Sequence, residues 1–294
     1  MPEGVIVKAI SSRYVVSTPD GSVTCSARGR LKLDRSAPLV GDRVVLSLIT
    51  DTEGTIESIE PRRNSFIRPA VANVDALIMI CADVNPITDP FLVDRIAAIA
   101  TLKSCEPVVV INKTDLARTD RLYSIYSGAG FTTLRTSAET GEGVGELREA
   151  LRGKISVFTG NSGVGKSSLL NALDPGFSAA TGEVSEKLGR GKHKTRHVEL
   201  YTLERDTMII DTPGFSSFDA EEGILARKCD LQYAFREFEP FIGSCRFTDC
   251  AHVRDDGCAV LAALAEGKIS AERHASYVRL YEQASKLREW ELKD

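Results

Sequence analysis

Short stretches of alternating apolar and polar residues occupy the first part of the chain. They are separated by turn residues and cover residues 5–10, 14–18, 22–26, 44–49 and 55–59. Strand-length stretches at this close spacing predict a small antiparallel barrel or sandwich. Five strands fit an oligonucleotide-binding (OB) barrel, whose open face and loops commonly hold RNA, although a small barrel without a ligand has the same pattern. We therefore expect residues 1–65 to form a β-barrel domain that is a candidate for RNA binding.

From about residue 72 the pattern changes to continuous apolar runs that alternate with helical stretches. The runs predict strands at residues 76–82, 107–111, 155–159 and 207–210, and the stretches between them predict helices at residues 91–102, 145–151 and 167–173. Such alternation is typical of an α/β fold with a mostly parallel sheet and helices on both faces. Ligands of such sheets bind at the carboxyl ends of the strands, so the residues after each run are candidates for a site. We assign residues 66–222 to this domain.

Beyond about residue 222, apolar side chains recur at helical spacing on either side of a cysteine-rich loop. They are Leu231, Ala234, Phe235 and Phe238 before the loop, and Tyr277, Leu280, Tyr281, Ala284, Leu287 and Trp290 after it. We expect residues 223–294 to form a small helical domain that is held partly by a metal ion. His274 is expected on the surface of the second helical segment.

The composition is that of a globular chain with more than one domain. Of the 294 residues, 43% are hydrophobic and 27% are charged, and the formal net charge is −4. These values argue against a disordered or membrane protein. The apolar runs are too short to span a bilayer, and the first residues do not form a secretion signal. We expect a cytoplasmic protein without membrane contact, whose seven cysteines are reduced thiols and metal ligands.

A phosphate-binding loop follows the third apolar run. Lys166 can neutralise the β- and γ-phosphates of a nucleotide, and the Ser167 hydroxyl can bind Mg²⁺. Backbone N–H groups of such a loop point at phosphate oxygens, helped by the positive end of the following helix. The pattern is GxxxxGK[ST], and the residues assigned to nucleotide binding are Gly160, Asn161, Ser162, Gly163, Val164, Gly165, Lys166, Ser167 and Ser168.

A second motif can read the nucleotide base. Asp115 can accept hydrogen bonds from the ring N–H and the exocyclic amine of guanine, whereas adenine has no matching pair of donors. Asn112 can support the loop, and the Lys113 stem can cover the ring. A backbone N–H from Ser137 or Ala138 can bind the guanine oxygen, although Glu139 stands where many GTPases have Lys. The motif, Asn112-Lys113-Thr114-Asp115, therefore favours GTP over ATP.

A third motif begins at Asp211 and ends at Gly214. Asp211 can hold Mg²⁺ through a water molecule, and the Gly214 N–H can sense the γ-phosphate, so the segment after it should change with hydrolysis. The next residue, Phe215, has no group that can orient an attacking water, whereas many GTPases have Gln there. A catalytic group must therefore come from elsewhere.

Four soft ligands lie within fourteen positions of the cysteine-rich loop. They are Cys245, Cys250, His252 and Cys258. Three thiolates and one imidazole suit tetrahedral Zn²⁺, and a full set of four protein ligands leaves no position for a catalytic water. We therefore expect one structural zinc ion.

The order of these motifs is circularly permuted relative to an ordinary small GTPase, in which the phosphate loop comes first and the base-reading motif comes near the end. Order, spacing and the Phe after Asp-Thr-Pro-Gly resemble the bacterial RsgA family, also called YjeQ or YloQ, of circularly permuted GTPases. The resemblance covers essentially the whole chain. It implies an OB-fold barrel, a circularly permuted P-loop GTPase domain and a C-terminal zinc domain. It also implies GTP hydrolysis that is stimulated by the 30S ribosomal subunit late in its maturation.

In that family, a His in the loop before Asp-Thr-Pro-Gly has been proposed to assist hydrolysis. The resemblance transfers this role to His193 and the Mg²⁺ and γ-phosphate role to Thr195, with Lys194 as a departure from the family pattern. His193 also lies within residues 187–197, a run with five Lys or Arg and no acid. Such a run can contact RNA phosphates even on an acidic protein, or it can be a solvated loop. Both roles of His193, catalytic and RNA-contacting, stay open.

Two functional hypotheses follow. The first is a GTPase that binds GTP with Mg²⁺, associates with the 30S subunit and its rRNA as a monomer, and uses hydrolysis to time its release. The second is an rRNA-binding checkpoint factor for which GTP is mainly a conformational ligand. Phe215 favours the second hypothesis when the protein is alone.

Overall fold

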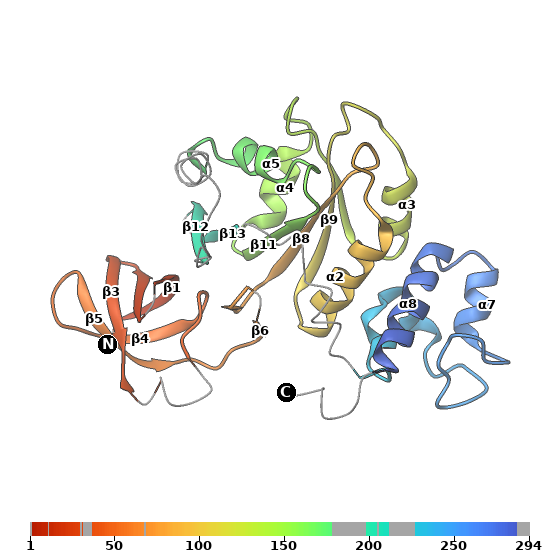
Figure 1. The fold of residues 1–294 in the computed structure, drawn as a ribbon, viewed down its shortest axis with the longest axis horizontal. Coiled ribbons are helices and arrows are strands. Elements are labelled where there is room, and N and C mark those ends of the chain that lie inside the picture. The colour runs from red at the N-terminus through yellow and green to blue at the C-terminus, as the bar shows by residue number, and fades with distance from the viewer. Residues whose placement is uncertain are drawn as a thin grey trace, which may run out of the picture. The chain divides into compact units, whose positions relative to one another are not determined.

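The computed structural model describes most of the chain as two compact units. The described residues are 2–10, 12–29, 31, 37–67, 69–177, 198–204, 206–211 and 227–286. The first unit comprises Met1–Ala76, Ala150–Phe158 and Asp174–Phe215, and the second comprises Leu77–Glu149, Thr159–Leu173 and Ser216–Asp294 (Figure 1).

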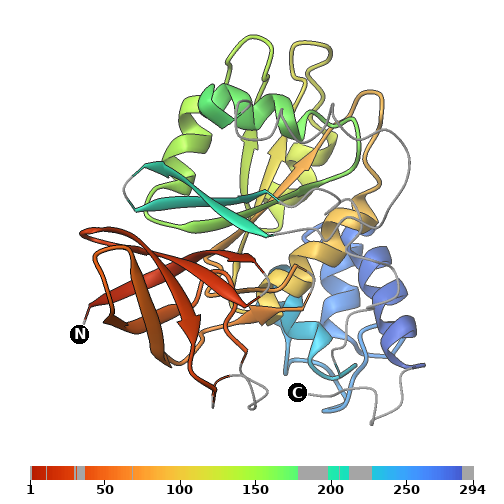
Figure 2. The ribbon, with the colours of Figure 1, turned by 60° about the vertical axis from the view of Figure 1, so that its left-hand side comes forward.

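The first unit begins with a closed five-stranded barrel, which Figure 2 shows in red and orange. Its strands pair in the order β1-β2-β3-β5-β4, and β4 also pairs with β1, so the barrel closes. Alternate side chains point inward, and Ile6, Val16 and Leu46 are fully buried. The strands are β1 (Glu3–Ile10), β2 (Arg13–Thr18), β3 (Gly21–Ala27), β4 (Arg43–Leu48) and β5 (Glu53–Ile59). The expected five-stranded barrel is confirmed, and its closure through β1 and β4 covers the apolar face that the period-two pattern predicts.

The turn before β4 depends on a buried ion pair. The Asp42 carboxylate is fully buried and accepts from Nε and Nη2 of Arg62 at 2.7 and 2.8 Å. Gly41 has a φ of +90°, and a Cβ there would lie 2.1 Å from the carbonyl oxygen of Ala72. Only glycine allows this close approach of two backbones. Ala72 belongs to β7 (Val71–Ala72), which pairs with β6 (Ser65–Phe66).

The first unit also contains β12 (Glu199–Glu204), β13 (Thr207–Asp211) and most of β11 (Ile155–Gly160). Strand β11 runs parallel to β13, and β12 runs antiparallel to β13. Strand β12 was not expected from the sequence, because its alternating polar residues lack a continuous apolar run. It also pairs with β1, where Lys8 Nζ lies 2.7 Å from Glu199 Oε2.

The second unit contains strands in the order β10-β9-β8 with helices packed on them. Every side chain of β8 is buried, and α2 begins at an Asp89 carboxylate that caps the Phe91 N–H at 3.0 Å. Pro90 at the first helical position fits this start, since its missing N–H would have no partner there. The strands are β8 (Ala76–Cys81), β9 (Glu106–Ile111) and β10 (Thr132–Arg135), and the helices are α2 (Pro90–Leu102), α3 (Arg121–Gly128), α4 (Val144–Leu151) and α5 (Lys166–Leu173). The expected α/β fold is confirmed.

The C-terminal part of the second unit packs directly on α2. Its elements are η1 (Leu231–Ala234), η2 (Arg236–Phe241), α7 (Ala259–Ala265) and α8 (Ala271–Ala284). Phe91 and Ala98 of α2 share one buried cluster with Phe235 and Tyr277, and Figure 1 shows α8 beside α2. The first helical stretch is two short 3₁₀ helices, and Pro240 within η2 lacks the N–H that a continuous α-helix would need. Leu287 and Trp290 lie outside the described residues.

Arg273 is a buried anchor between α8 and α2. Its side chain is 1% exposed, and Nη1 lies 2.8 Å from Asp94 Oδ1 on α2. Nε and Nη2 donate to the two carboxylate oxygens of Glu237 at 2.7 and 3.0 Å. The guanidinium also lies over the Phe235 ring, 4.5 Å from its centroid. Because a buried charge without partners is costly, this arrangement strongly specifies how α8 sits on α2.

No helix among the described residues combines the length and the apolar character needed to cross a membrane.

Candidate nucleotide site and metal centre

The phosphate loop lies between a strand and a helix, as its sequence predicts. It joins the end of β11 to the start of α5. The Val164 side chain is fully buried and anchors the loop, whereas Ser162, Gly163 and Ser167 are exposed. Free N–H groups at the start of a helix attract anions, so the exposed side of this loop can receive phosphate oxygens.

The base-reading loop follows β9 and is held by the loop that follows β10. The Thr114 N–H donates to the Thr136 carbonyl at 3.2 Å. Ser137 Oγ donates to Asp115 Oδ1 at 2.6 Å, and Asp115 is otherwise exposed. This hydrogen bond orients a carboxylate that remains open to solvent. An oriented carboxylate can accept from two adjacent N–H donors, and the guanine edge supplies such a pair.

Asn112 joins the two loops. Its side chain is 2% exposed, and its Nδ2 donates to the Val164 carbonyl at 2.9 Å. Its Oδ1 accepts from Thr136 Oγ1 and from the Ala138 N–H, each at 3.2 Å. One amide therefore fixes the phosphate loop, the base-reading motif and the Ser137-Ala138 loop at one point. The base-reading motif and the phosphate loop, which come in exchanged order along the chain, lie together in space.

Two expected contacts differ in detail. The Ala138 N–H, which the sequence assigned to the guanine oxygen, donates to Asn112 in this structure. Lys113, whose stem was expected over the base, has a φ of +67° and donates from Nζ to the Asn85 carbonyl at 3.0 Å. Both groups have protein partners in this structure.

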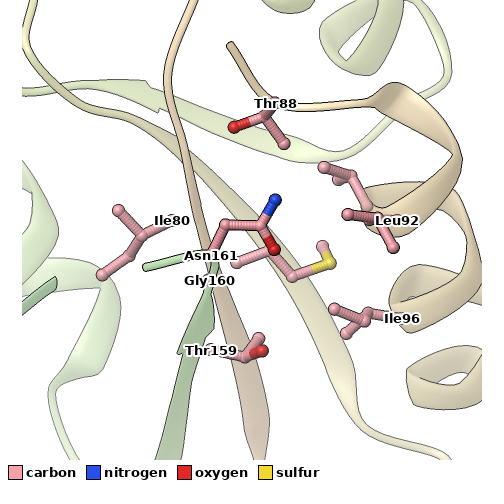
Figure 3. A pocket seen from close by; sticks show the side chains of 9 residues that line it. Ile80, Thr88, Leu92, Ile96, Thr159, Gly160 and Asn161 are labelled. Carbon is pink, nitrogen blue, oxygen red and sulfur yellow. The ribbon is translucent and has the colours of Figure 1, made fainter. Parts of the chain in front are cut away.

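A small hollow lies beside the phosphate loop and is shown in Figure 3. It is lined by Gly160 and Asn161 of the loop, by Ile80 of β8, and by Leu92 and Ile96 of α2. Most of these side chains are apolar, so binding a charged phosphate in the hollow would be unfavourable. It is packing space between α2 and the sheet.

Several expected site residues fall outside the part of the chain that the structure describes. These are His193, Thr195, Gly214 and Phe215, together with the basic run at residues 187–197. Asp211 is the last residue of β13, where its backbone pairs with Glu199. Of the three expected Mg²⁺ ligands, Ser167 is the one whose side chain is described, and it is exposed at the start of α5.

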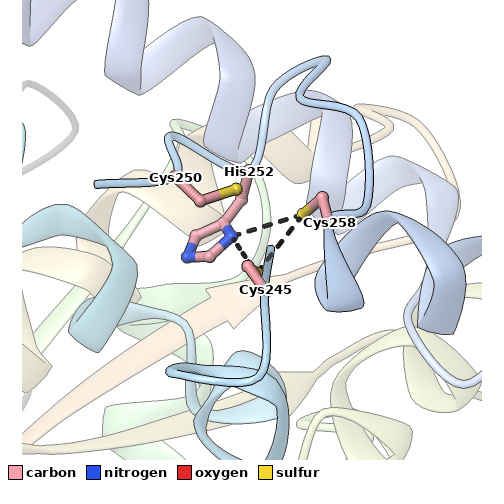
Figure 4. Close-up of side chains that lie close together, drawn as sticks. All are labelled: Cys245, Cys250, His252 and Cys258. Carbon is pink, nitrogen blue, oxygen red and sulfur yellow. Dashed lines mark hydrogen bonds between the residues drawn. The ribbon is translucent and has the colours of Figure 1, made fainter. Parts of the chain in front are cut away.

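The four expected metal ligands converge, as Figure 4 shows. The ligand atoms of Cys245, Cys250, His252 and Cys258 all lie within 4.8 Å of one another. His252 Nδ1 lies 3.5 Å from Cys245 Sγ and 3.4 Å from Cys258 Sγ. Three sulfurs and one imidazole nitrogen at such distances can hold a tetrahedral metal ion, and zinc is the metal that this donor set suits.

The environment of the thiols also fits a cation. Burial raises the pKa of Cys250 to about 12 and also raises the pKa of Cys258, while burial lowers the pKa of His252. Burial therefore disfavours the charged forms of the Cys250 and Cys258 thiols and of the His252 ring. The backbone N–H groups of Ala259 and Leu261 already point at the Cys245 and Cys258 sulfurs, at 3.3 and 3.4 Å. A divalent cation would supply the charge that holds the thiolates, which these N–H groups would then stabilise.

The sequence interpretation missed His274. It was expected on a helix surface, but it is 8% exposed, and its Nε2 lies 2.8 Å from the His252 carbonyl oxygen. That expectation is wrong because His274 shares the inward face of α8 with Tyr277, one helical turn away. The spacing of 274, 277 and 281 contained this signal.

Comparisons with known proteins agree with this geometry. The chain matches a model of the RsgA GTPase domain over residues 59–221 and a model of the RsgA N-terminal domain over residues 3–56. It is 42% identical to the small ribosomal subunit biogenesis GTPase RsgA of Caldanaerobacter subterraneus subsp. tengcongensis, over 95% of this chain and 94% of that one. It is 39% identical to the protein of the same name from Bacillus cereus (strain ATCC 14579), over 96% of this chain and 97% of that one.

Solved structures are similar over nearly the whole chain. The crystal structure of YjeQ from Thermotoga maritima gives a TM-score of 0.81 at 33% identity and covers 98% of this chain and 99% of that one. The structure of YloQ, a circularly permuted GTPase, gives a TM-score of 0.80 at 31% identity and covers 98% of this chain and 97% of that one. With the phosphate loop, the base-reading loop and the Cys/His cluster in the places described above, this chain belongs to the RsgA GTPase family of circularly permuted, GTP-hydrolysing enzymes.

Proposed function

We propose that this protein binds the 30S ribosomal subunit and hydrolyses GTP to GDP and phosphate during late small-subunit maturation, with hydrolysis coupled to release. The observation that carries the nucleotide part is the Asn112 amide, which joins the base-reading loop to the phosphate loop. The ribosomal part is supported by the relatives, which are named small ribosomal subunit biogenesis GTPases. We place the protein in the cytoplasm as a monomer.

The nucleotide contacts follow from the two loops. Asp115, oriented by Ser137, reads the guanine edge, with Asn112, Lys113, Thr114 and Ala138 around it. The phosphates lie against residues 160–168, where Lys166 neutralises the β- and γ-phosphates. Ser167 binds Mg²⁺ directly, together with Thr195, and Asp211 holds the ion through water. Gly214 senses the γ-phosphate, so that hydrolysis changes the segment after it.

Catalysis needs a group other than Phe215, because a phenyl ring cannot orient water. His193 is our candidate for that group, and an RNA contact is its alternative role. Phe215 also supports a second candidate function, an rRNA-binding checkpoint factor that uses GTP mainly as a conformational ligand.

We assign one structural zinc ion to Cys245, Cys250, His252 and Cys258. The four donors would fill a tetrahedral coordination shell, so the ion would stabilise the fold and carry no substrate. We place the barrel domain at residues 1–65, the GTPase domain at residues 66–222 and the zinc domain at residues 223–294. The candidates for rRNA contact are the barrel, the basic run at residues 187–197 and the zinc domain.

GTP turnover with and without purified 30S subunits tests the proposed function. Strong stimulation by the 30S subunit supports the GTPase, and equal turnover with and without it favours the checkpoint factor. The Lys166→Ala variant is the control, and it should lose both basal and stimulated turnover because the phosphates lose their cation. If His193→Ala retains full stimulated turnover, the catalytic role of His193 is excluded.

A further inference from the structure

The side-chain amide of Gln232 lies between the backbone carbonyl of Cys229 and the imidazole ring of His252, at the edge of the metal cluster. Its Oε1 lies 2.8 Å from His252 Nε2, and its Nε2 donates to the Cys229 carbonyl at 3.1 Å. We propose that Gln232 is a positioning residue that makes Nδ1 of His252 the metal ligand and fixes the orientation of the ring. Gln232 is not one of the four ligands, and it was not expected from the sequence.

The Cys229 carbonyl determines which way the Gln232 amide points. A carbonyl oxygen can only accept a hydrogen bond, so the NH₂ end of the amide must face it. The oxygen of Gln232 then faces the His252 ring. Since that oxygen also can only accept, Nε2 of His252 must carry the proton and donate it.

A neutral His252 with its proton on Nε2 has its lone pair on Nδ1. Nδ1 is the ring atom that faces the sulfurs of Cys245 and Cys258. Metal-bound histidines almost always donate their second N–H to a carbonyl, carboxylate or water, and such partners orient the ring. The Gln232 amide is the partner in this chain.

The backbone of His252 is fixed separately from its ring. His252 has a φ of +56°, in the left-handed region, and its carbonyl accepts from His274 Nε2 at 2.8 Å. His274 therefore holds the loop, whereas Gln232 selects the ring nitrogen. Losing either contact should have a different signature, because the first changes the backbone and the second changes the ring tautomer.

Gln232 also connects the metal loop to the helix that borders the phosphate loop. It belongs to η1, whose Leu231 and Ala234 are buried in the same cluster as Phe91 of α2. The hydrogen bond from His252 to Gln232 is thus a direct link between the metal cluster and the core that α2 shares. This amide is the contact from η1 that reaches the His252 ring by a hydrogen bond, beside the apolar packing of the metal loop against the same cluster.

Zinc retention by the purified full-length protein tests the proposal. In Gln232→Met, the acceptor for His252 is lost, and transfer of zinc to a chromogenic chelator should become roughly 10- to 100-fold faster. Gln232→Glu keeps an acceptor for Nε2–H and should release zinc more slowly than Gln232→Met. Gln283→Met is the matched control, because Gln283 is exposed on α8, and it should release zinc at the wild-type rate. Equal release by Gln232→Met and wild type would overturn the proposal.

The tautomer is measured in the wild-type protein, which keeps the test independent of whether a variant folds. Long-range ¹H–¹⁵N correlation of zinc-loaded, ¹⁵N-histidine-labelled protein should show His252 with zinc on Nδ1 and the proton on Nε2. Zinc on Nε2 would overturn the inference while leaving the metal site intact. The inference rests on the proposed zinc site, so purified protein that binds no zinc would remove both the zinc site and the role of Gln232. Zinc release and the NMR measurement do not depend on GTP turnover, so they test the inference separately from the GTPase activity.

Discussion

The side-chain amide of Asn112 donates to the main-chain carbonyl of Val164 at 2.9 Å, across 52 positions of sequence. The donor belongs to the base-reading loop and the acceptor to the phosphate loop. In most small GTPases the phosphate loop comes first, and here it comes second, but the two loops still meet through one hydrogen bond. A permuted chain can keep the site because side-chain packing at the end of the sheet does not depend on the order in which strands are connected.

We expect Gly165 to tolerate no side chain, because the Asn112 amide occupies the space that a Cβ would need. A Cβ on Gly165 would lie 2.3 Å from Asn112 Nδ2, and the residue has a φ of +93°. We expect Gly165→Ala to displace the Asn112 amide and weaken GDP binding by about 10- to 100-fold, or about 1.4–2.8 kcal/mol. Isothermal titration with GDP measures this loss. Gly130→Ala is the matched control, because Gly130 has a φ of +79° but a Cβ there would meet nothing within 4 Å.

The loss at Gly165 should depend on Asn112. In the Asn112→Ala background the colliding amide is absent, so Gly165→Ala should cost less than it does in the wild type. A double-mutant cycle on the free energy of GDP binding measures this coupling, which should be at least about 0.5 kcal/mol for groups in contact. Additive losses would show that the glycine and the amide act separately.

The parts of the site that could be predicted from the sequence are those with a fixed local spacing. The phosphate loop needs glycines and a lysine within eight positions, and the zinc ligands need sulfur and nitrogen within one loop, so both are visible in a single segment. Strands β8, β9, β11 and β13 were also predicted, because continuous apolar runs specify buried parallel strands, whereas β10, β12 and α3 were not predicted. The OB-type barrel was predicted from its period-two stretches.

The parts that could not be predicted depend on contacts between distant segments. In the sequence, nothing distinguishes Arg273 from a surface arginine, whereas in the structure it is buried and paired with Asp94 and Glu237. Gln232 and His274 support the metal loop from two other elements, and local spacing did not indicate that role for Gln232. A linear pattern predicts which residues share one face of one element, but it does not predict which elements face one another.

Arg273 should be essential for stability of the second unit. Arg273→Met leaves the buried carboxylates of Asp94 and Glu237 without their cation, and breaking such a pair typically costs about 3–5 kcal/mol in the free energy of unfolding. Urea unfolding at neutral pH measures the loss. Arg279→Met on the same helix is the control, because Arg279 is exposed and mainly stacks on the Phe91 ring at 3.6 Å. It should cost about 1 kcal/mol or less.

The deficit of Arg273→Met should shrink at low pH. Burial raises the pKa of Asp94, and the neighbouring Arg273 opposes this rise. Without Arg273, the folded state binds a proton at Asp94 more readily than the unfolded chain, whose Asp has a pKa of about 4. The unfolding free energy of the variant should therefore rise relative to wild type as the pH falls from neutral towards 4. A deficit that stays constant or grows over this range would contradict a buried, uncompensated Asp94.

Zinc binding should release protons. Burial raises the pKa of Cys250 to about 12 and also raises the pKa of Cys258, so both thiols are protonated in the metal-free protein at neutral pH. His252 is neutral there, because burial lowers its pKa. Zinc must therefore displace at least these two protons, and its affinity should rise about 100-fold for each pH unit around neutrality. Calorimetric titration of metal-free protein with zinc, repeated in buffers of different ionisation enthalpy, counts the protons, and a release of one or none would contradict thiolate ligation.

We expect the two loops joined by Asn112 and Val164 to form one site that reads guanine through Asp115. In Asp115→Asn, one carboxylate oxygen becomes an NH₂ donor, which matches the carbonyl that xanthine carries in place of the guanine amine. Competitive binding of GDP and xanthosine diphosphate to the wild type and this variant is the most direct test. We expect the wild type to prefer GDP and the variant to prefer xanthosine diphosphate, each by roughly 10- to 100-fold. A variant that still prefers GDP would show that Asp115 does not read the base.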